Sequence, residues 1–404
     1  EVHPVDWAPV RKAIRALKAG TVRLHNPSFK VSFFDRMNNP PQHRSKFAAE
    51  ELWNFYQRTI HDERLLEAEP EAQALVRELM LLLLDQGLSL NFPFNDGRHP
   101  SSTIIAGNPL GKTIHDRRDL ELFDAIMDSN IPMSAHYAVK GHDEGPEAVQ
   151  RYMVGDVPTP DPSTGCSYLH LLANGALQVT LVRELYQVYT AKVAGRDMEE
   201  VVQSTGLRKL EPFAPTLKEF LDDMRAGHPK PDVEMRRLLV RKIDQEVEAH
   251  IAERLFKHPD FDFSDMELNV LTSIKENGIP DVTSLYDRNP LMVAVFMGRV
   301  SLIRCFNDEL EKRIANNDPV VPSALEAYRR ALGSTSAYHD RSPLHIAALR
   351  YGQDSDIFEQ VRRGERLVAG DGSDGRLATL RDDQGRVPLD YNGKVWDGII
   401  VWGE

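Results

Sequence analysis

The spacing of apolar and polar residues predicts helices along most of the chain. Residues 7–18 place Val10 and Ile14 on one side of a helix, and a leucine-rich helix over 71–85 precedes Gly87, a residue type that often ends helices. The same helical period continues over 119–129, 177–193, 217–225, 235–256, 266–277, 302–314 and 324–332. We therefore predict an all-α fold.

One helix start is marked by the sequence Asp340-Arg341-Ser342-Pro343-Leu344-His345. Ser342 can accept hydrogen bonds from the N–H groups of the first turn, and Pro343 stands at the first helical position, where its missing N–H costs nothing. The residues that follow are apolar and several are small, so that another helix can approach closely. This stretch predicts a capped helix that packs against a neighbouring helix.

The same pattern recurs along the chain with increasing departures. The copies contain Arg288-Asn289-Pro290, Arg386-Val387-Pro388, Gly165-Cys166-Ser167 with Tyr168 in place of the proline, and Arg98-His99-Pro100 with two serines after it. A pattern that repeats every few tens of residues in a helical chain is typical of a solenoid, where each unit buries its apolar side by stacking on the next. We predict an irregular helical solenoid.

The shared pattern Gly/Asp-Arg-x-Pro-Leu-His-x-Ala resembles the ankyrin repeat. The resemblance implies that the histidines of the pattern bind neighbouring backbone and hold adjacent loops together, while the prolines begin the first helix of each repeat. The repeat-structural residues are then Pro100, His170, Pro290, Pro343, His345 and Pro388.

The copies divide the chain into five predicted segments. These are an N-terminal helical region (1–70), first ankyrin-like repeats (71–195), a helical insertion or degenerate repeats (196–262), C-terminal ankyrin-like repeats (263–392) and an apolar tail (393–404). The distance along the chain from Pro290 to Pro343 exceeds the roughly 33 residues of a standard repeat, so the extra residues must form loops or an additional helix.

Composition narrows the classes of partner. The net charge of −12 argues against nucleic acid as the main ligand, because phosphate binding needs a basic surface. The longest apolar run, 79–84, is far shorter than the roughly 20 residues of a membrane span. Two cysteines form no disulfide framework and fit a reducing compartment. We expect a protein without a membrane span, located in the cytoplasm or secreted into the cytoplasm of a host cell.

Two stretches invite a chemical interpretation. The segment 107–113, with Gly111, Lys112 and Thr113, matches a relaxed phosphate-loop pattern that is one residue short, and an inter-helix loop is the simpler interpretation. Cys166 and His170 lie four residues apart, but no further ligands are near them in the sequence, and zinc takes three or four. We predict no metal site, no cofactor and no catalytic residues.

The arginine of the pattern is the best candidate for contact with a partner. Arg98, Arg288, Arg341 and Arg386 each lie two residues before the proline or its equivalent, so stacking would align them along one ridge near the concave face that repeat arrays use for binding. The alternative is that these arginines pair with aspartates of adjacent loops, such as Asp287 or Asp340.

These observations favour a module that binds a partner protein through stacked ankyrin-like repeats. The irregular repeats with insertions look like those of ankyrin proteins that bacteria deliver into host cells, which suggests an effector with a role in virulence. Two alternatives stay open. One is a host-modifying enzyme with its activity in 1–60 or 138–260 and repeats that recruit the substrate. The other is a nucleotide-binding switch built on Lys112. An enzyme is the less favoured class.

Overall fold

The computed structural model describes the chain in several ranges. They are residues 8–20, 109–128, 136–137, 166–227, 233–267, 289–335, 340–369 and 377–391, without 118, 176 and 260, together with 75, 78, 79, 81 and 82. Arg98, Pro100 and Arg288 of the predicted sites, and the predicted tail 393–404, lie outside the described residues.

The described part of the chain is helical, which confirms the all-α part of the prediction, while the ankyrin-type solenoid stays a prediction. The α-helices are α1 (Ala8–Lys18), α6 (Pro109–Asp116), α7 (Leu120–Asp128), α9 (Tyr168–Asn174), α10 (Leu177–Val193), α11 (Met198–Ser204), α12 (Leu207–Leu210), α13 (Pro215–Ala226), α14 (Val233–Lys257), α15 (Pro290–Phe296), α16 (Val300–Ala315), α17 (Val321–Gly333), α18 (Pro343–Tyr351) and α19 (Asp356–Ala369). Short 3₁₀ turns are η2 (Phe263–Glu267), η4 (Leu377–Thr379) and η5 (Pro388–Asp390), and β1 (His136–Tyr137) and β2 (Cys166–Ser167) are strands of two residues. Within the described ranges, none of the helices is both long and apolar enough to cross a membrane.

The chain forms two compact units. The first comprises residues 1–112 and 121–160, and the second comprises 113–120 and 161–404. In the first unit, Ile14 and Leu17 of α1 are buried, and Lys18 forms an ion pair with Glu78. The second unit carries four copies of the repeated pattern, those at the starts of α9, α15, α18 and η5. The division into five segments stays a prediction.

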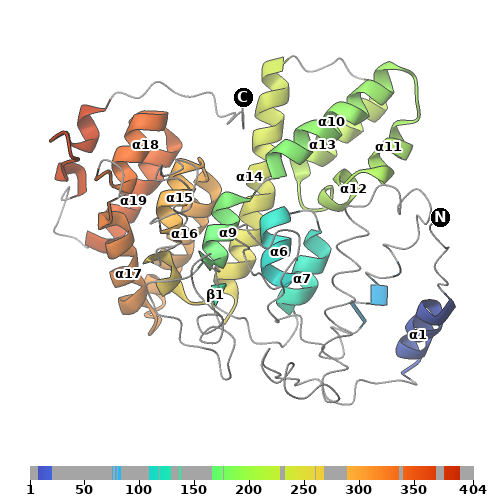
Figure 1. The fold of residues 1–404 in the computed structure, drawn as a ribbon, viewed down its shortest axis with the longest axis horizontal. Helices are drawn as coiled ribbons and strands as arrows, with labels where there is room; N and C mark the ends of the chain where they lie inside the picture. The colour runs from blue at the N-terminus through green and yellow to red at the C-terminus, as the bar shows by residue number, and fades with distance from the viewer. Residues whose placement is uncertain are drawn as a thin grey trace, which may run out of the picture. The chain divides into compact units, whose positions relative to one another are not determined.

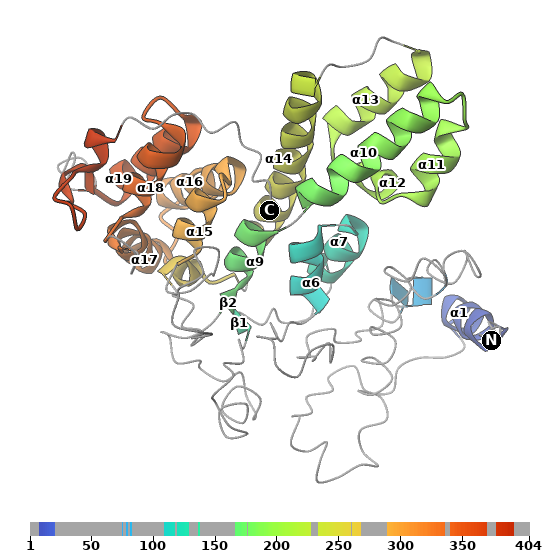
Figure 2. The ribbon, with the colours of Figure 1, turned by 45° about the horizontal axis from the view of Figure 1, so that its top comes forward.

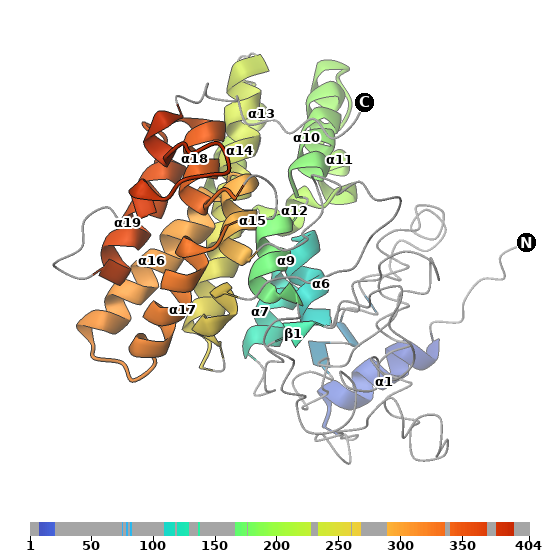
Figure 3. The same cartoon turned by 60° about the vertical axis from the view of Figure 1, so that its left-hand side comes forward.

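Helices of the second unit form two adjoining rows. In one row α9 packs against α15 and α15 against α18 (Figure 1). Helix α18 in turn packs against η5, and each of these four elements begins at one copy of the repeated pattern. In the other row α14 packs against α16 and α16 against α19 (Figure 3). Short turns join α15 to α16 and α18 to α19, so that consecutive helices occupy both rows.

Local sequence explains why the short helices start where they do. The Asn289 side chain accepts a hydrogen bond from the Met292 amide at 2.8 Å, and Ser342 caps α18 in the same way, with Pro290 and Pro343 in the first turn. Small buried residues on facing helices, such as Ala294 and Ala347, permit close packing within the row. The expected helix starts at these two prolines are confirmed.

Two groups of helices depart from a regular repeat. Helices α11, α12 and α13 follow α10 in the sequence, and Figure 2 shows these three helices grouped with α10. Helix α14 comes next and packs against α16. Helix α17 lies between α16 and α18 in sequence, packs against η2 and α19, and accounts for the long stretch from Pro290 to Pro343. The last copy forms only the single turn η5 at Pro388.

Candidate functional site

The predicted phosphate loop is part of a helix. Helix α6 begins at Pro109, so Gly111, Lys112 and Thr113 are helical residues, and the Thr113 side chain is buried. A phosphate cradle instead needs a glycine-rich loop whose N–H groups point at the ligand before the helix starts. This corrects the expectation of an inter-helix loop and leaves the nucleotide switch without its defining geometry.

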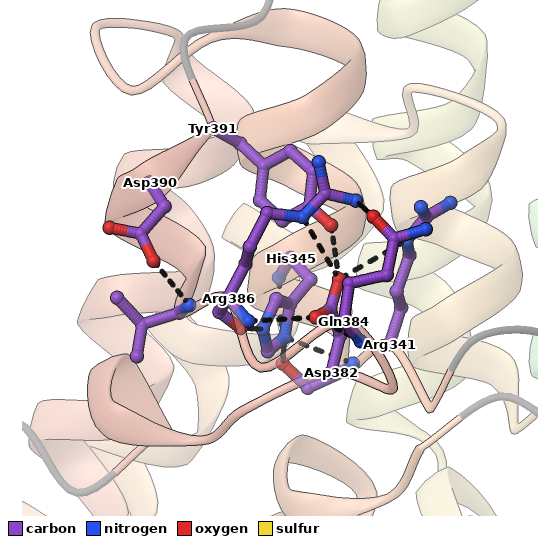
Figure 4. A network of polar contacts seen from close by, with 9 residues as sticks. Arg341, His345, Asp382, Gln384, Arg386, Asp390 and Tyr391 are labelled. Atoms are coloured by element: carbon purple, nitrogen blue, oxygen red, sulfur yellow. Dashed lines mark hydrogen bonds and ion pairs between the residues drawn. The ribbon is translucent and has the colours of Figure 1, made fainter.

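The loop before η5 is held by one carboxylate. The Asp382 Oδ1 atom accepts hydrogen bonds from the amides of Gln384 and Arg386, both at 2.9 Å, and Oδ2 accepts one from the Tyr391 hydroxyl (Figure 4). Gly385 completes the turn with a φ of +73°, which favours glycine. Burial alone would raise the pKa of Asp382, but these hydrogen bonds outweigh it and lower the pKa to about 2.

Two of the four predicted ridge arginines converge on this carboxylate. The Nε atoms of Arg341 and Arg386 lie 4.0 Å and 3.6 Å from Asp382 Oδ2, and both guanidinium groups stand over the Tyr391 ring, at 5.7 Å and 4.5 Å from its centroid. Both arginines therefore contact an aspartate of a loop, and that aspartate is Asp382. Asp287, one of the two suggested partners, lies outside the described residues. The Arg386 side chain keeps 40% of its surface exposed, against 19% for Arg341.

His345 joins the start of α18 to the loop before η5. Its Nδ1 accepts from the Ser342 amide at 3.3 Å and lies 2.8 Å from Ser342 Oγ, and its Nε2 lies 3.1 Å from the Arg386 carbonyl oxygen. A carbonyl only accepts, so Nε2 carries a proton, and Nδ1 has none because it accepts from the Ser342 amide; the imidazole is therefore neutral. His170 makes the same Nδ1 contacts with Ser167, at 3.1 Å and 3.0 Å. We call Arg341, His345, Asp382, Arg386 and Tyr391 the loop cluster.

The neutral state of His345 makes the stability of this link depend on pH. Burial is the main cause that lowers the pKa of His345 below its ordinary 6.5, against the opposing effect of the Arg386 carbonyl. The unfolded chain therefore binds the proton more readily than the folded chain does. The contribution of neutral His345 to the free energy of unfolding is complete above pH 6.5 and is lost as the pH falls through the folded-state pKa. We expect His345→Gln to cost about 1–3 kcal/mol at neutral pH.

Urea unfolding of the wild type and of His345→Gln at a series of pH values measures this effect. The difference between the two free energies of unfolding should shrink as the pH falls below 6.5. A difference that stays constant or grows under acid conditions would contradict the neutral assignment.

A second cluster was not predicted. Arg117, Asp244, Glu248 and Arg299 are each at most 6% exposed, and we call them the buried charge cluster. Asp244 Oδ1 accepts from Arg117 Nη1 at 3.0 Å, and Oδ2 accepts from Arg299 Nη1 at 2.5 Å. Glu248 Oε2 lies 3.6 Å from Arg117 Nη2 and 3.4 Å from Arg299 Nη1. Two cations and two anions thus meet away from water.

Three of these side chains also bind the ends of helices. Arg117 donates to the Leu172 carbonyl, and Arg299 donates from Nε to Ala173 O at 3.0 Å and from Nη2 to Gly175 O at 2.5 Å, which satisfies the last carbonyls of α9. Glu248 Oε1 accepts from the Leu302 amide at 2.8 Å, in the first turn of α16. The cluster therefore fastens α9 and α16 to the middle of α14.

Neither cluster has the composition of a catalytic centre. The carboxylates of the buried charge cluster are fully engaged by arginines and amides. Burial raises the pKa of Cys305 to about 12, so this thiol stays protonated at neutral pH. No group of three or more potential metal ligands was found among the residues that the structure describes.

No protein-family model, curated protein or solved structure matches this chain.

Proposed function

We propose that this protein binds a partner protein through stacked, ankyrin-type helix pairs. The observation that carries the proposal is the His345–Arg386 link, which joins one copy of the repeated pattern to the loop of the next copy at 3.1 Å. The row of α9, α15, α18 and η5 supports it, since each of these elements begins at a copy. Stacked repeats present an extended surface to other proteins.

The loop before η5 is the part of this surface with the firmest support. Its backbone is held by Asp382 and His345, while Asp383 and Gln384 are exposed at the tip. Leu389 on η5 is also 53% exposed and adds an apolar side chain to this surface. A rigid backbone with exposed side chains binds at a lower entropic cost than a mobile loop does. We also propose that the ridge of arginines binds the partner and that the protein acts in a host cell.

The test combines a partner search with point variants. Intact protein would be used to isolate a stoichiometric partner, and its affinity would be compared among the wild type, Asp383→Lys and Leu389→Asp. We expect at least about a tenfold weaker affinity for one or both variants, because few residues carry most of the binding energy. Both side chains are exposed, so the fold should persist.

Glu219→Lys is the matched control. Glu219 is exposed on α13, outside the two rows, and the same charge change there should leave the affinity unchanged. A partner that binds all four proteins equally would contradict binding at this end of the stack.

A further inference from the structure

Helix α10 carries two separate lines of apolar residues. Leu181, Leu185, Val188 and Ala191 are buried against the rest of the second unit. Val182, Tyr186, Tyr189 and Val193 follow each other at intervals of four, three and four residues, which places them along a second line, about 120° around the helix from the buried one. We call these four residues the α10 stripe.

The α10 stripe is exposed to solvent. Val182, Tyr186 and Val193 keep 51%, 59% and 54% of their surface accessible, while Tyr189 is intermediate. A single exposed apolar residue needs no explanation, but a continuous line over three helical turns does, because aligned apolar residues on a surface mark interaction sites. At 1.5 Å per residue the stripe is about 16 Å long, close to the seam of a short helix pair.

Cations flank the stripe on α10, in a chain that is acidic overall. Arg183 and Lys192 are exposed on either side of it and Arg196 follows the helix, whereas Glu184, the only acidic residue of α10, is buried. Among the described residues, none of these three cations has an ion-pair partner. The guanidinium of Arg236 on α14 stands 5.3 Å from the centroid of the Tyr189 ring and adds a further cation at the edge.

We propose that the α10 stripe binds an amphipathic helix of a partner protein whose apolar side is flanked by acidic residues. The line of residues at heptad spacing fits the apolar side of a second helix, and the surrounding cations fit acidic flanks. A second copy of this chain is the poorer occupant, because a symmetric pair of α10 helices would bring the same cations together. This surface lies on α10, apart from the loop before η5, so it does not depend on the function proposed for that loop.

The occupant class can be tested with designed peptides and intact protein. The probe is a fluorescent amphipathic helical peptide with leucine at its a and d positions and glutamate elsewhere, and the matched probe carries lysine in place of glutamate. Fluorescence anisotropy should show saturable one-to-one binding of the acidic peptide. Tyr186→Glu should weaken it at least about tenfold and Arg183→Glu about threefold, the latter less at high salt.

Leu238→Glu is the matched control. Leu238 is 60% exposed on α14, but it lies two residues from Arg236, about 200° around the helix, and so faces away from the stripe. This variant should bind the acidic peptide like the wild type. Circular dichroism checks that all variants fold.

Four outcomes would overturn the proposal. They are the absence of saturable binding by the acidic peptide, equal binding of the lysine peptide, and equal binding by Tyr186→Glu. The fourth is a wild-type dimer that Tyr186→Glu dissociates, which would make the occupant a second copy. Binding of phosphatidylserine vesicles without binding of the acidic peptide would instead assign the stripe to a lipid surface.

Discussion

Asp244→Ala should lower the free energy of unfolding by about 3–5 kcal/mol. The substitution leaves Arg117 and Arg299 buried side by side with only Glu248 to compensate them, and Glu248 is already engaged by the Leu302 amide. Two buried like charges without sufficient counter-charge cost far more than the loss of an ion pair in water. Urea denaturation of the intact protein measures the effect.

Asp222→Ala is the control for this experiment. Asp222 also contacts two cations, Lys218 and Arg225, but it is 49% exposed, so its removal should cost about 1 kcal/mol or less. If Asp244→Ala destabilised the protein no more than Asp222→Ala does, the buried charge cluster would not be what fastens α9 and α16 to α14.

Gly175→Ala should also be strongly destabilising, by about 2–4 kcal/mol. A Cβ atom at this position would lie 2.5 Å from Arg117 Nε and 2.9 Å from Arg117 Cζ. The guanidinium cannot move aside without cost, because Nη1 is bound to Asp244 and Nη2 to the Leu172 carbonyl. The variant therefore either displaces a buried cation from its partners or shifts the end of α9.

Gly206→Ala is the comparison for this prediction. A Cβ there would meet the carboxylate end of Glu184 at 3.2 Å, and Gly206 has a φ of −70°, which any residue adopts. A cost of about 1 kcal/mol or less is expected, since the neighbour can shift slightly. Equal midpoints of thermal unfolding for the two variants would show that the Arg117 side chain can move away from the added Cβ atom at little cost, and would contradict the prediction.

Local sequence was sufficient for most helices and for their starts. The capping residues Asn289 and Ser342 act on amides three residues away, so the interaction is contained in a short stretch and can be recognised without the fold. The same holds for the resemblance between copies, which depends on residues next to each other in the chain. The extent of α6 was missed because Gly111 and the preceding proline suggested a loop, whereas Leu110 and Ile114 are buried and favour a helix.

Both clusters depend on contacts that a linear pattern does not contain. In the sequence of α14, Asp244 and Glu248 have arginines and other acidic residues as neighbours, a pattern that is typical of the solvent-exposed side of a helix. Asp244 and Glu248 are buried because the folded chain packs Arg117 and Arg299 against them, and these arginines lie 127 and 55 residues from Asp244 in the sequence. Likewise, the regular place of Arg341 and Arg386 before proline indicated a ridge, and the position of Asp382 decided that both contact one carboxylate.

The sequence by itself thus determined that this protein is helical and where α15 and α18 begin, because periodicity and capping act within a few residues. It also showed that these two starts share one pattern. Only the tertiary structure decided which charges are buried, which apolar line of α10 remains exposed, and which loops are linked. Burial and long-range pairing depend on which segment covers another, and that is a property of the whole packed unit.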